Sequence, residues 1–107
     1  VKDPNIHAVF VLTNLESHLE YTKLALEAGK HVLVEKPVGV SVAEIEQMKT
    51  IADAKKLVCM PGHNYIYESS MNRTKELVSE GELGKIVSAY VMYNIHHPEE
   101  VAKRYPG

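Results

Sequence analysis

The chain has 107 residues, of which 45% are hydrophobic and 24% are charged, the balance of an ordinary globular domain. Its formal net charge of −2 gives no basic stripe for nucleic acid, and no apolar run approaches the ~20 residues that span a bilayer. The single cysteine, Cys59, cannot form an internal disulfide, which fits a reducing compartment. We therefore expect a cytoplasmic protein with neither a nucleic-acid nor a membrane partner.

The first part of the chain predicts strands that alternate with helices. The apolar run over residues 7–13 is typical of a strand in a parallel sheet that is covered on both faces. Apolar residues at helical spacing predict an amphipathic helix over residues 16–28, ended by Gly29. Residues 31–34 predict the second strand. Two strands joined by one helix indicate a right-handed βαβ unit.

A second helix is predicted to begin at Ser41. Ser41 and Glu44 have the spacing of a capping box, in which each side chain bonds the backbone of the other residue. A third short strand is predicted over residues 57–60, before Pro61 and Gly62. The resulting order, β-α-β-α-β, is that of the second half of a doubly wound, Rossmann-like parallel sheet.

The character of the sequence changes after Gly62. Residues 63–67 are polar and aromatic, and helical spacing predicts a third helix over residues 69–80 that stops at Gly81. Residues 86–94 are rich in Val and Tyr, which favours a long strand. This strand is expected to open a second, larger sheet that this chain does not complete.

The triplet Glu35-Lys36-Pro37 directly follows the second predicted strand. Ligands of open α/β sheets bind outside the carboxyl ends of the strands, so charge placed there is positioned for a ligand. Pro37 biases Lys36 toward an extended conformation, and the Lys36–Pro37 bond is a candidate for the cis form, which X-Pro bonds tolerate cheaply. The alternative interpretation of the triplet is a surface ion pair in a turn.

Several motifs occur in an order and at spacings that together resemble a known family. They are Asp3-Pro4, Thr13 with His18, Ala28-Gly29-Lys30-His31-Val32, Glu35-Lys36-Pro37, Gly62-His63-Asn64-Tyr65 and Gly81-Glu82-Leu83-Gly84-Lys85-Ile86. With them the chain resembles the NAD(P)-dependent oxidoreductases of the glucose–fructose oxidoreductase / inositol dehydrogenase (Gfo/Idh/MocA) family. The resemblance implies that residues 1–62 are the second half of a Rossmann domain. Residues 63–107 would then begin an α/β domain for substrate binding and oligomerisation.

The resemblance also implies an activity. Members of this family move hydride between a nicotinamide cofactor, NAD or NADP, and a hydroxyl of a sugar, polyol or inositol. In such enzymes the residue matching Lys36 lies beside the nicotinamide and the substrate, and the residue matching Glu35 faces the ribose. A fixed ammonium can stabilise a developing oxyanion and pass a proton, and a carboxylate can accept hydrogen bonds from ribose hydroxyls.

Further cofactor contacts are expected at Thr13, Asn14, His18, Pro37 and Asn64. The family often has Thr-Pro-Asn where this chain has Thr13-Asn14-Leu15, which moves the Asn by one place. For His18 a structural role in the first helical turn is the alternative, and for Asn64 with its neighbour His63 it is simple loop polarity. Tyr65 and Tyr67 are interpreted as packing residues, and His7, His31 and Cys59 as structural.

Two further expectations concern what the chain lacks. The chain contains no Gly-x-Gly-x-x-Gly, so we expect it to be an internal piece whose pyrophosphate-binding turn precedes Val1, and which alone binds NAD(H) weakly. His96 and His97 are adjacent, and neighbouring strand residues point to opposite faces, so no metal site is predicted.

Two other activities stay open beside the dehydrogenase. Some relatives of this fold are regulators that sense sugars and bind protein partners, and others cleave glycosides with tightly held NAD. Retention of Glu35 and Lys36 favours a hydride-transferring enzyme. The resemblance also implies a homo-oligomer, and it leaves the choice between NAD and NADP open.

Overall fold

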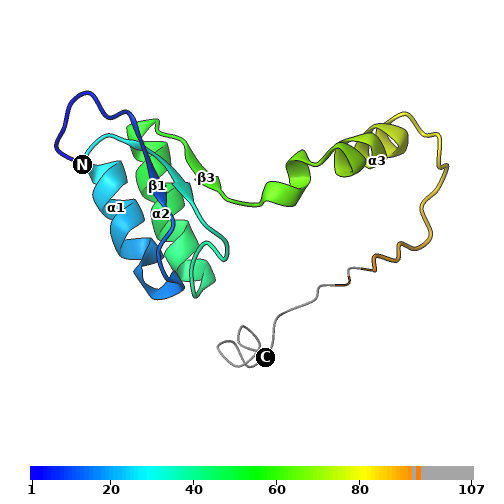
Figure 1. Cartoon of the computed structure of the whole chain (residues 1–107), viewed down its shortest axis with the longest axis horizontal. Coiled ribbons are helices and arrows are strands. Elements are labelled where there is room, and N and C mark those ends of the chain that lie inside the picture. The colour runs from blue at the N-terminus through cyan, green and yellow to red at the C-terminus, as the bar shows by residue number, and fades with distance from the viewer. Residues whose placement is uncertain (93, 95–107) are drawn as a thin grey trace. The chain divides into compact units, whose positions relative to one another are not determined.

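The computed structural model describes residues 1–92 and 94, and its contacts divide the chain into two units, Val1–Asn72 and Arg73–Gly107. Strands and helices alternate along the first unit (Figure 1). α3 begins in the first unit and continues into the second. The elements are β1 (Ala8–Val11), η1 (Leu15–Ser17), α1 (His18–Glu27), β2 (His31–Val34), α2 (Val42–Lys55), β3 (Cys59–Pro61), η2 (Asn64–Tyr67) and α3 (Ser69–Ser79).

The three strands form one parallel sheet in the order β1-β2-β3. Val11 pairs with Val34, and Val34 pairs with Pro61, so the last residues of all three strands are in register. The predicted β-α-β-α-β order and the α/β fold class are confirmed. Because parallel neighbours run the same way, everything that leaves the strands leaves at one edge of the sheet.

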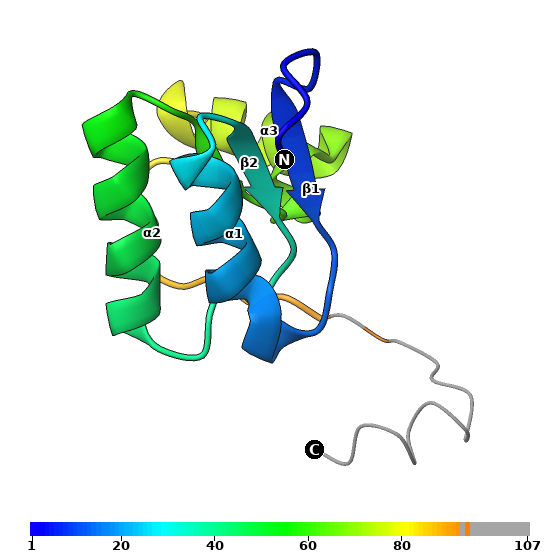
Figure 2. The same ribbon diagram turned by 90° about the vertical axis from the view of Figure 1, so that its left-hand side faces the viewer.

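Helices α1 and α2 lie side by side and pack on the same face of this sheet (Figure 2). Two successive right-handed crossovers place their helices on the same side, which is why both contribute to one core. Phe10, on the opposite face of β1, keeps 65% of its surface exposed. The buried core cluster comprises Val11, Ala25, Leu26, Val32, Val34 and Ala52.

The ends of α1 and α2 show local chemistry that the sequence predicts. Gly29 adopts a φ of 76°, and the N–H of Lys30 donates to Ala25 O at 3.0 Å, the hydrogen bond of a Schellman ending. At the start of α2, Ser41 Oγ accepts from the backbone N–H of Glu44 at 3.3 Å. These ends set the direction in which the chain re-enters β2 and leaves toward α2.

The capping box is confirmed in one half and altered in the other. Glu44 Oε2 accepts from the N–H of Val40 at 3.0 Å, one residue before the expected partner Ser41. Ser41 is fully extended, with φ −152° and ψ 159°, as is usual for the residue that caps a helix N-terminus. The carboxylate therefore ties the preceding loop to the first turn of α2.

Element boundaries differ from the predicted ones where pairing decides them. β1 is shorter than residues 7–13, because only residues with register partners in β2 form the ladder. β3 is displaced from the predicted residues 57–60, because its pairing with β2 runs from Val32↔Cys59 to Val34↔Pro61. The predicted helix over residues 16–28 is a 3-10 turn, η1, followed by α1.

The second unit contains most of α3, which ends at Ser79, one residue before the predicted end, and is followed by Gly81 with a φ of 78°. The predicted strand over residues 86–94 is wrong for residues 86–92 and 94, which form no strand. Val87 is 90% exposed and Tyr90 is 86% exposed. An extended segment becomes a strand only when a neighbour accepts and donates its backbone hydrogen bonds, and a β-favouring composition does not supply that neighbour.

Two further findings hold for the described part of the chain. None of its helices combines the length and the apolar character needed to cross a membrane. No three of its His, Cys, Asp or Glu side chains converge on a point where a metal ion could bind. His96 and His97 lie outside the described residues.

Candidate functional site

The carboxyl ends of the three strands are held in step by backbone hydrogen bonds. The N–H of Glu35, just after β2, donates to Val11 O at 2.9 Å. The N–H of Gly62, just after β3, donates to Val34 O at 2.8 Å. The segments that follow β1, β2 and β3 therefore emerge together, at the edge where open α/β sheets bind their ligands.

The backbone bends at Lys36 and Pro37, shortly after the end of β2. The Lys36–Pro37 peptide is cis, as the sequence allowed. Glu35 is half-buried, and its Oε1 accepts from the backbone N–H of Lys36 at 2.8 Å. The carboxylate thus orients the peptide from which the Lys36 side chain departs.

A hollow of about 400 Å³ at this edge is lined by Lys36, Pro37, His63, Asn64 and Tyr65. The structure thereby brings together three predicted site residues, Lys36, Pro37 and Asn64, from the segments after β2 and β3. Lys36 forms no ion pair with any side chain that the structure describes. An ammonium beside an imidazole, an amide and a phenol suits a ligand rich in hydroxyl groups.

The sequence predicts a packing role for Tyr65, yet Tyr65 also lines this hollow. The available signal was its position in the loop that follows the third strand, next to His63 and Asn64. Composition alone cannot separate the two roles, because a tyrosine ring serves packing and ligand contact equally well.

His18, a predicted cofactor residue, is only 1% exposed. Its Nδ1 lies 2.8 Å from Pro37 O, and its Nε2 lies 3.1 Å from Thr13 O. The ring therefore lies between the segment after β1 and the segment after β2, a buried position that suits a structural role in the first turn of α1. Contact between His18 and a cofactor stays a prediction.

Thr13 and Asn14 are engaged within their own turn and do not line the hollow of Lys36. Ser17 Oγ lies 2.8 Å from Thr13 Oγ1 and 2.8 Å from Asn14 O. The Asn14 amide donates to Glu16 Oε2 at 3.2 Å. Both residues are exposed at the predicted edge, and their cofactor contacts stay predictions.

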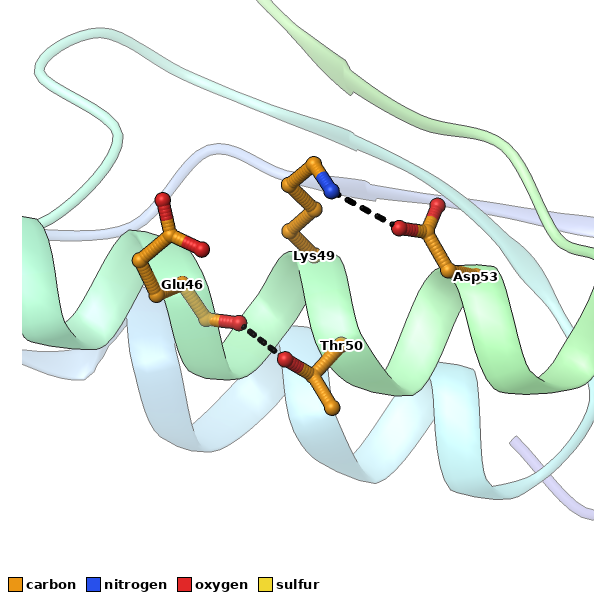
Figure 3. Close-up of polar contacts among 4 residues, drawn as sticks. All are labelled: Glu46, Lys49, Thr50 and Asp53. Atoms are coloured by element: carbon orange, nitrogen blue, oxygen red, sulfur yellow. Dashed lines mark hydrogen bonds and ion pairs between the residues drawn. The ribbon is translucent and has the colours of Figure 1, made fainter.

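Lys49 on α2 differs from Lys36, because its ammonium is paired with Asp53 on the same helix (Figure 3). Its Nζ lies 2.9 Å from Asp53 Oδ2, and the two side chains are 65% and 66% exposed. The hydrogen bond to Asp53 raises the pKa of Lys49, and the charges of Asp53 and Glu46 act in the same direction. The next residue, Thr50, donates its Oγ1 hydrogen to Glu46 O, one turn earlier in α2, at 2.7 Å. Lys49 is thus a lysine already paired within its own helix.

A separate hollow of about 460 Å³ lies between α2 and the edge of β3. Its walls include Met48, Leu57 and Cys59, and none of the predicted site residues lines it. Burial raises the pKa of the Cys59 thiol, which keeps it in the unreactive neutral form. This hollow carries no chemistry comparable to that around Lys36.

The fold of this chain is similar to that of solved structures. The chain superposes on an oxidoreductase described as probable, YhhX, with a TM-score of 0.73 and 41% identity, covering 79% of this chain and 25% of that one. It superposes on a myo-inositol 2-dehydrogenase from Lactobacillus plantarum with a TM-score of 0.71 and 31% identity, covering 78% and 25%.

Sequence comparison agrees with the structural one. The chain is 37% identical over its whole length to the uncharacterized oxidoreductase YhhX of Escherichia coli K12, and it spans 30% of that protein. It is 38% identical over 101 residues to the NADP⁺-dependent scyllo-inositol 2-dehydrogenase IolW of Bacillus subtilis, which is 94% of this chain and 28% of IolW. The model of the oxidoreductase family with an NAD-binding Rossmann fold matches residues 1–63, which contain all three strands. The parallel sheet, the residues at its carboxyl edge and these matches together place the chain in the Gfo/Idh/MocA family of oxidoreductases.

Proposed function

We propose that the protein containing this chain transfers hydride between a nicotinamide cofactor and a hydroxyl of a sugar, polyol or inositol. The observation that carries the proposal is the position of Lys36, an unpaired cation among the described side chains, in a hollow at the carboxyl edge of a parallel sheet. Relatives named scyllo-inositol 2-dehydrogenase and D-xylose 1-dehydrogenase support the substrate class.

The residues present suit the nicotinamide end of such a cofactor. Glu35 Oε1 already accepts one hydrogen bond, and a carboxylate offers about four acceptor positions, so ribose hydroxyls can still donate to it. Asn64, from the segment after β3, offers both a donor and an acceptor to an amide. When bound, the cofactor supplies the hydride acceptor or donor, and this chain supplies the groups around it.

Lys36 is the group suited to the substrate oxygen. In the direction of reduction, hydride adds to the carbonyl carbon, and the Lys36 ammonium stabilises the negative charge that develops on the oxygen and donates the proton that makes it a hydroxyl. Oxidation is the reverse, and the proton returns to the Lys36 amine. The hydrogen bond from the Lys36 N–H to Glu35 restrains the backbone from which this ammonium extends. Restraint before the reaction lowers the reorganisation that the reaction itself needs.

The experiment is Lys36→Ala in the complete protein, assayed on a panel of sugars and inositols with NAD⁺ and NADP⁺. We expect kcat to fall by on the order of 100-fold or more, because a general acid–base group and an oxyanion partner are both lost. Cofactor affinity should change much less. Equal turnover in the variant and the parent would remove Lys36 from the mechanism.

Lys49→Ala is the matched control, because Lys49 is a lysine whose charge is satisfied by Asp53 on the surface of α2. It should leave kcat unchanged. A parent protein that binds sugar but oxidises none of the panel would favour the sensing regulator. Release of free sugar from glycosides without net NADH would favour the glycosidase.

A further inference from the structure

His18 is almost completely buried, yet both of its ring nitrogens face main-chain oxygens. Nδ1 lies 2.8 Å from Pro37 O, and Nε2 lies 3.1 Å from Thr13 O. The two carbonyls belong to the segments that follow β2 and β1.

Both partners of the ring are acceptors, so each contact is a hydrogen bond only when the nitrogen concerned carries a hydrogen. The neutral ring has one N–H. The shorter contact, to Pro37 O, is the one expected to hold it, because an N–H···O bond is optimal near 2.9 Å. Which nitrogen carries the hydrogen in a buried histidine is set by such partners.

Pro37 directly follows Lys36. The His18 ring therefore contacts the backbone one residue after the lysine of the proposed site. Glu35 restrains Lys36 from the other side, since its Oε1 accepts from the Lys36 N–H at 2.8 Å. The lysine backbone is thus held on both flanks by side chains. The flank held by His18 is anchored to the first turn of α1, which packs against the core.

We propose that His18 is a positioning residue, which donates Nδ1–H to Pro37 O and so fixes where Lys36 stands at the edge of the sheet. Its second nitrogen lies 3.1 Å from Thr13 O and, without a hydrogen, forms no hydrogen bond there. The effect of His18 on catalysis rests on the proposed function. The hydrogen bond from His18 to Pro37 O does not depend on that function.

The first test is therefore spectroscopic and uses the full 107-residue chain. Long-range ¹H–¹⁵N correlation spectra of the imidazole rings show which nitrogen of each histidine carries hydrogen. For His18 we expect hydrogen on Nδ1. A ring with hydrogen on Nε2 alone would overturn the proposal, whatever the activity of the protein.

The second test is kinetic and uses the complete protein. His18→Gln is expected to lower kcat by on the order of 10- to 100-fold through misplacement of Lys36, with a much smaller change in the KM for the cofactor. His31→Gln is the matched control. His31 also bonds the backbone, through Nδ1 to the Val58 N–H at 3.0 Å, but it stands at the opposite end of β2. It should leave kcat unchanged.

The outcomes separate the two proposals. Hydrogen on Nδ1 in a protein that oxidises no sugar would leave the hydrogen bond in place and refute the proposed function. Equal kcat in a folded His18→Gln variant and the parent would show that the bond exists without positioning Lys36. Were the variant not to fold, the imidazole spectrum of the unmodified chain would still decide the hydrogen bond.

Discussion

Gly62 and Glu35 lie so close that a side chain at Gly62 would press on the backbone of Glu35. A Cβ built on Gly62 would lie 3.3 Å from Glu35 Cα and 3.2 Å from Val34 O. The Gly62 N–H donates to the same Val34 oxygen at 2.8 Å. Since both neighbours are main-chain atoms, neither can move without displacing the end of β2. The absence of a side chain at Gly62 thus determines how Glu35 and Lys36 are presented.

Gly62→Ala is expected to lower the free energy of unfolding by about 1–3 kcal/mol, the usual cost of inserting a methyl into a tightly packed place. It should also shift the NMR signals of the Lys36 amide. Urea denaturation and an amide spectrum measure the two effects. Gly29→Ala is the control, because Gly29 has φ 76° and open space around it. It should cost about 1 kcal/mol through backbone conformation and leave the Lys36 amide in place. An unchanged Lys36 amide signal in Gly62→Ala would contradict the influence of Gly62 on the backbone of Glu35 and Lys36.

Thr22 has a completely buried hydroxyl on α1, for which the described residues provide no hydrogen-bond partner. Thr22→Val replaces that hydroxyl with a methyl of similar shape and keeps the branched side chain. We expect the free energy of unfolding to rise by about 1 kcal/mol, because an unsatisfied buried polar group is removed. Thr22→Ser keeps the hydroxyl and loses the methyl, and it should lower stability by about 1 kcal/mol. A destabilised Thr22→Val protein would show that the hydroxyl is satisfied.

Cys59 makes the free energy of unfolding depend on pH in the alkaline range. Burial raises the pKa of its thiol above the ordinary value of 9.0, so the unfolded chain loses this proton first. The folded state therefore binds more protons in this range, and its stability falls as the pH rises from 9.0 through the folded pKa. Cys59→Ala removes this contribution. The free energy of unfolding of the parent should fall more steeply above pH 9.0 than that of the variant, and parallel curves would contradict the burial effect.

Local chemistry in the sequence predicts much of this fold. Gly29 ends α1, and Ser41 caps α2, because both effects act within one helical turn. The strand over residues 86–94 could not be predicted in the same way. Its residues favour β structure, but a strand depends on a partner distant in sequence, and residues 86–92 and 94 form none.

The candidate site, too, was predicted from the sequence only in part. The sequence by itself determined that Glu35, Lys36 and Pro37 follow an apolar strand, and parallel pairing then places Asn64 at the same edge. Only the tertiary structure decided that Glu35 accepts from the N–H of its neighbour, and that the His18 ring faces two carbonyl oxygens. Chain order sets which segments leave the sheet together, because parallel strands end on one side. The partners of each polar group depend on distances between those segments, and these exist only after α1 has packed on the sheet.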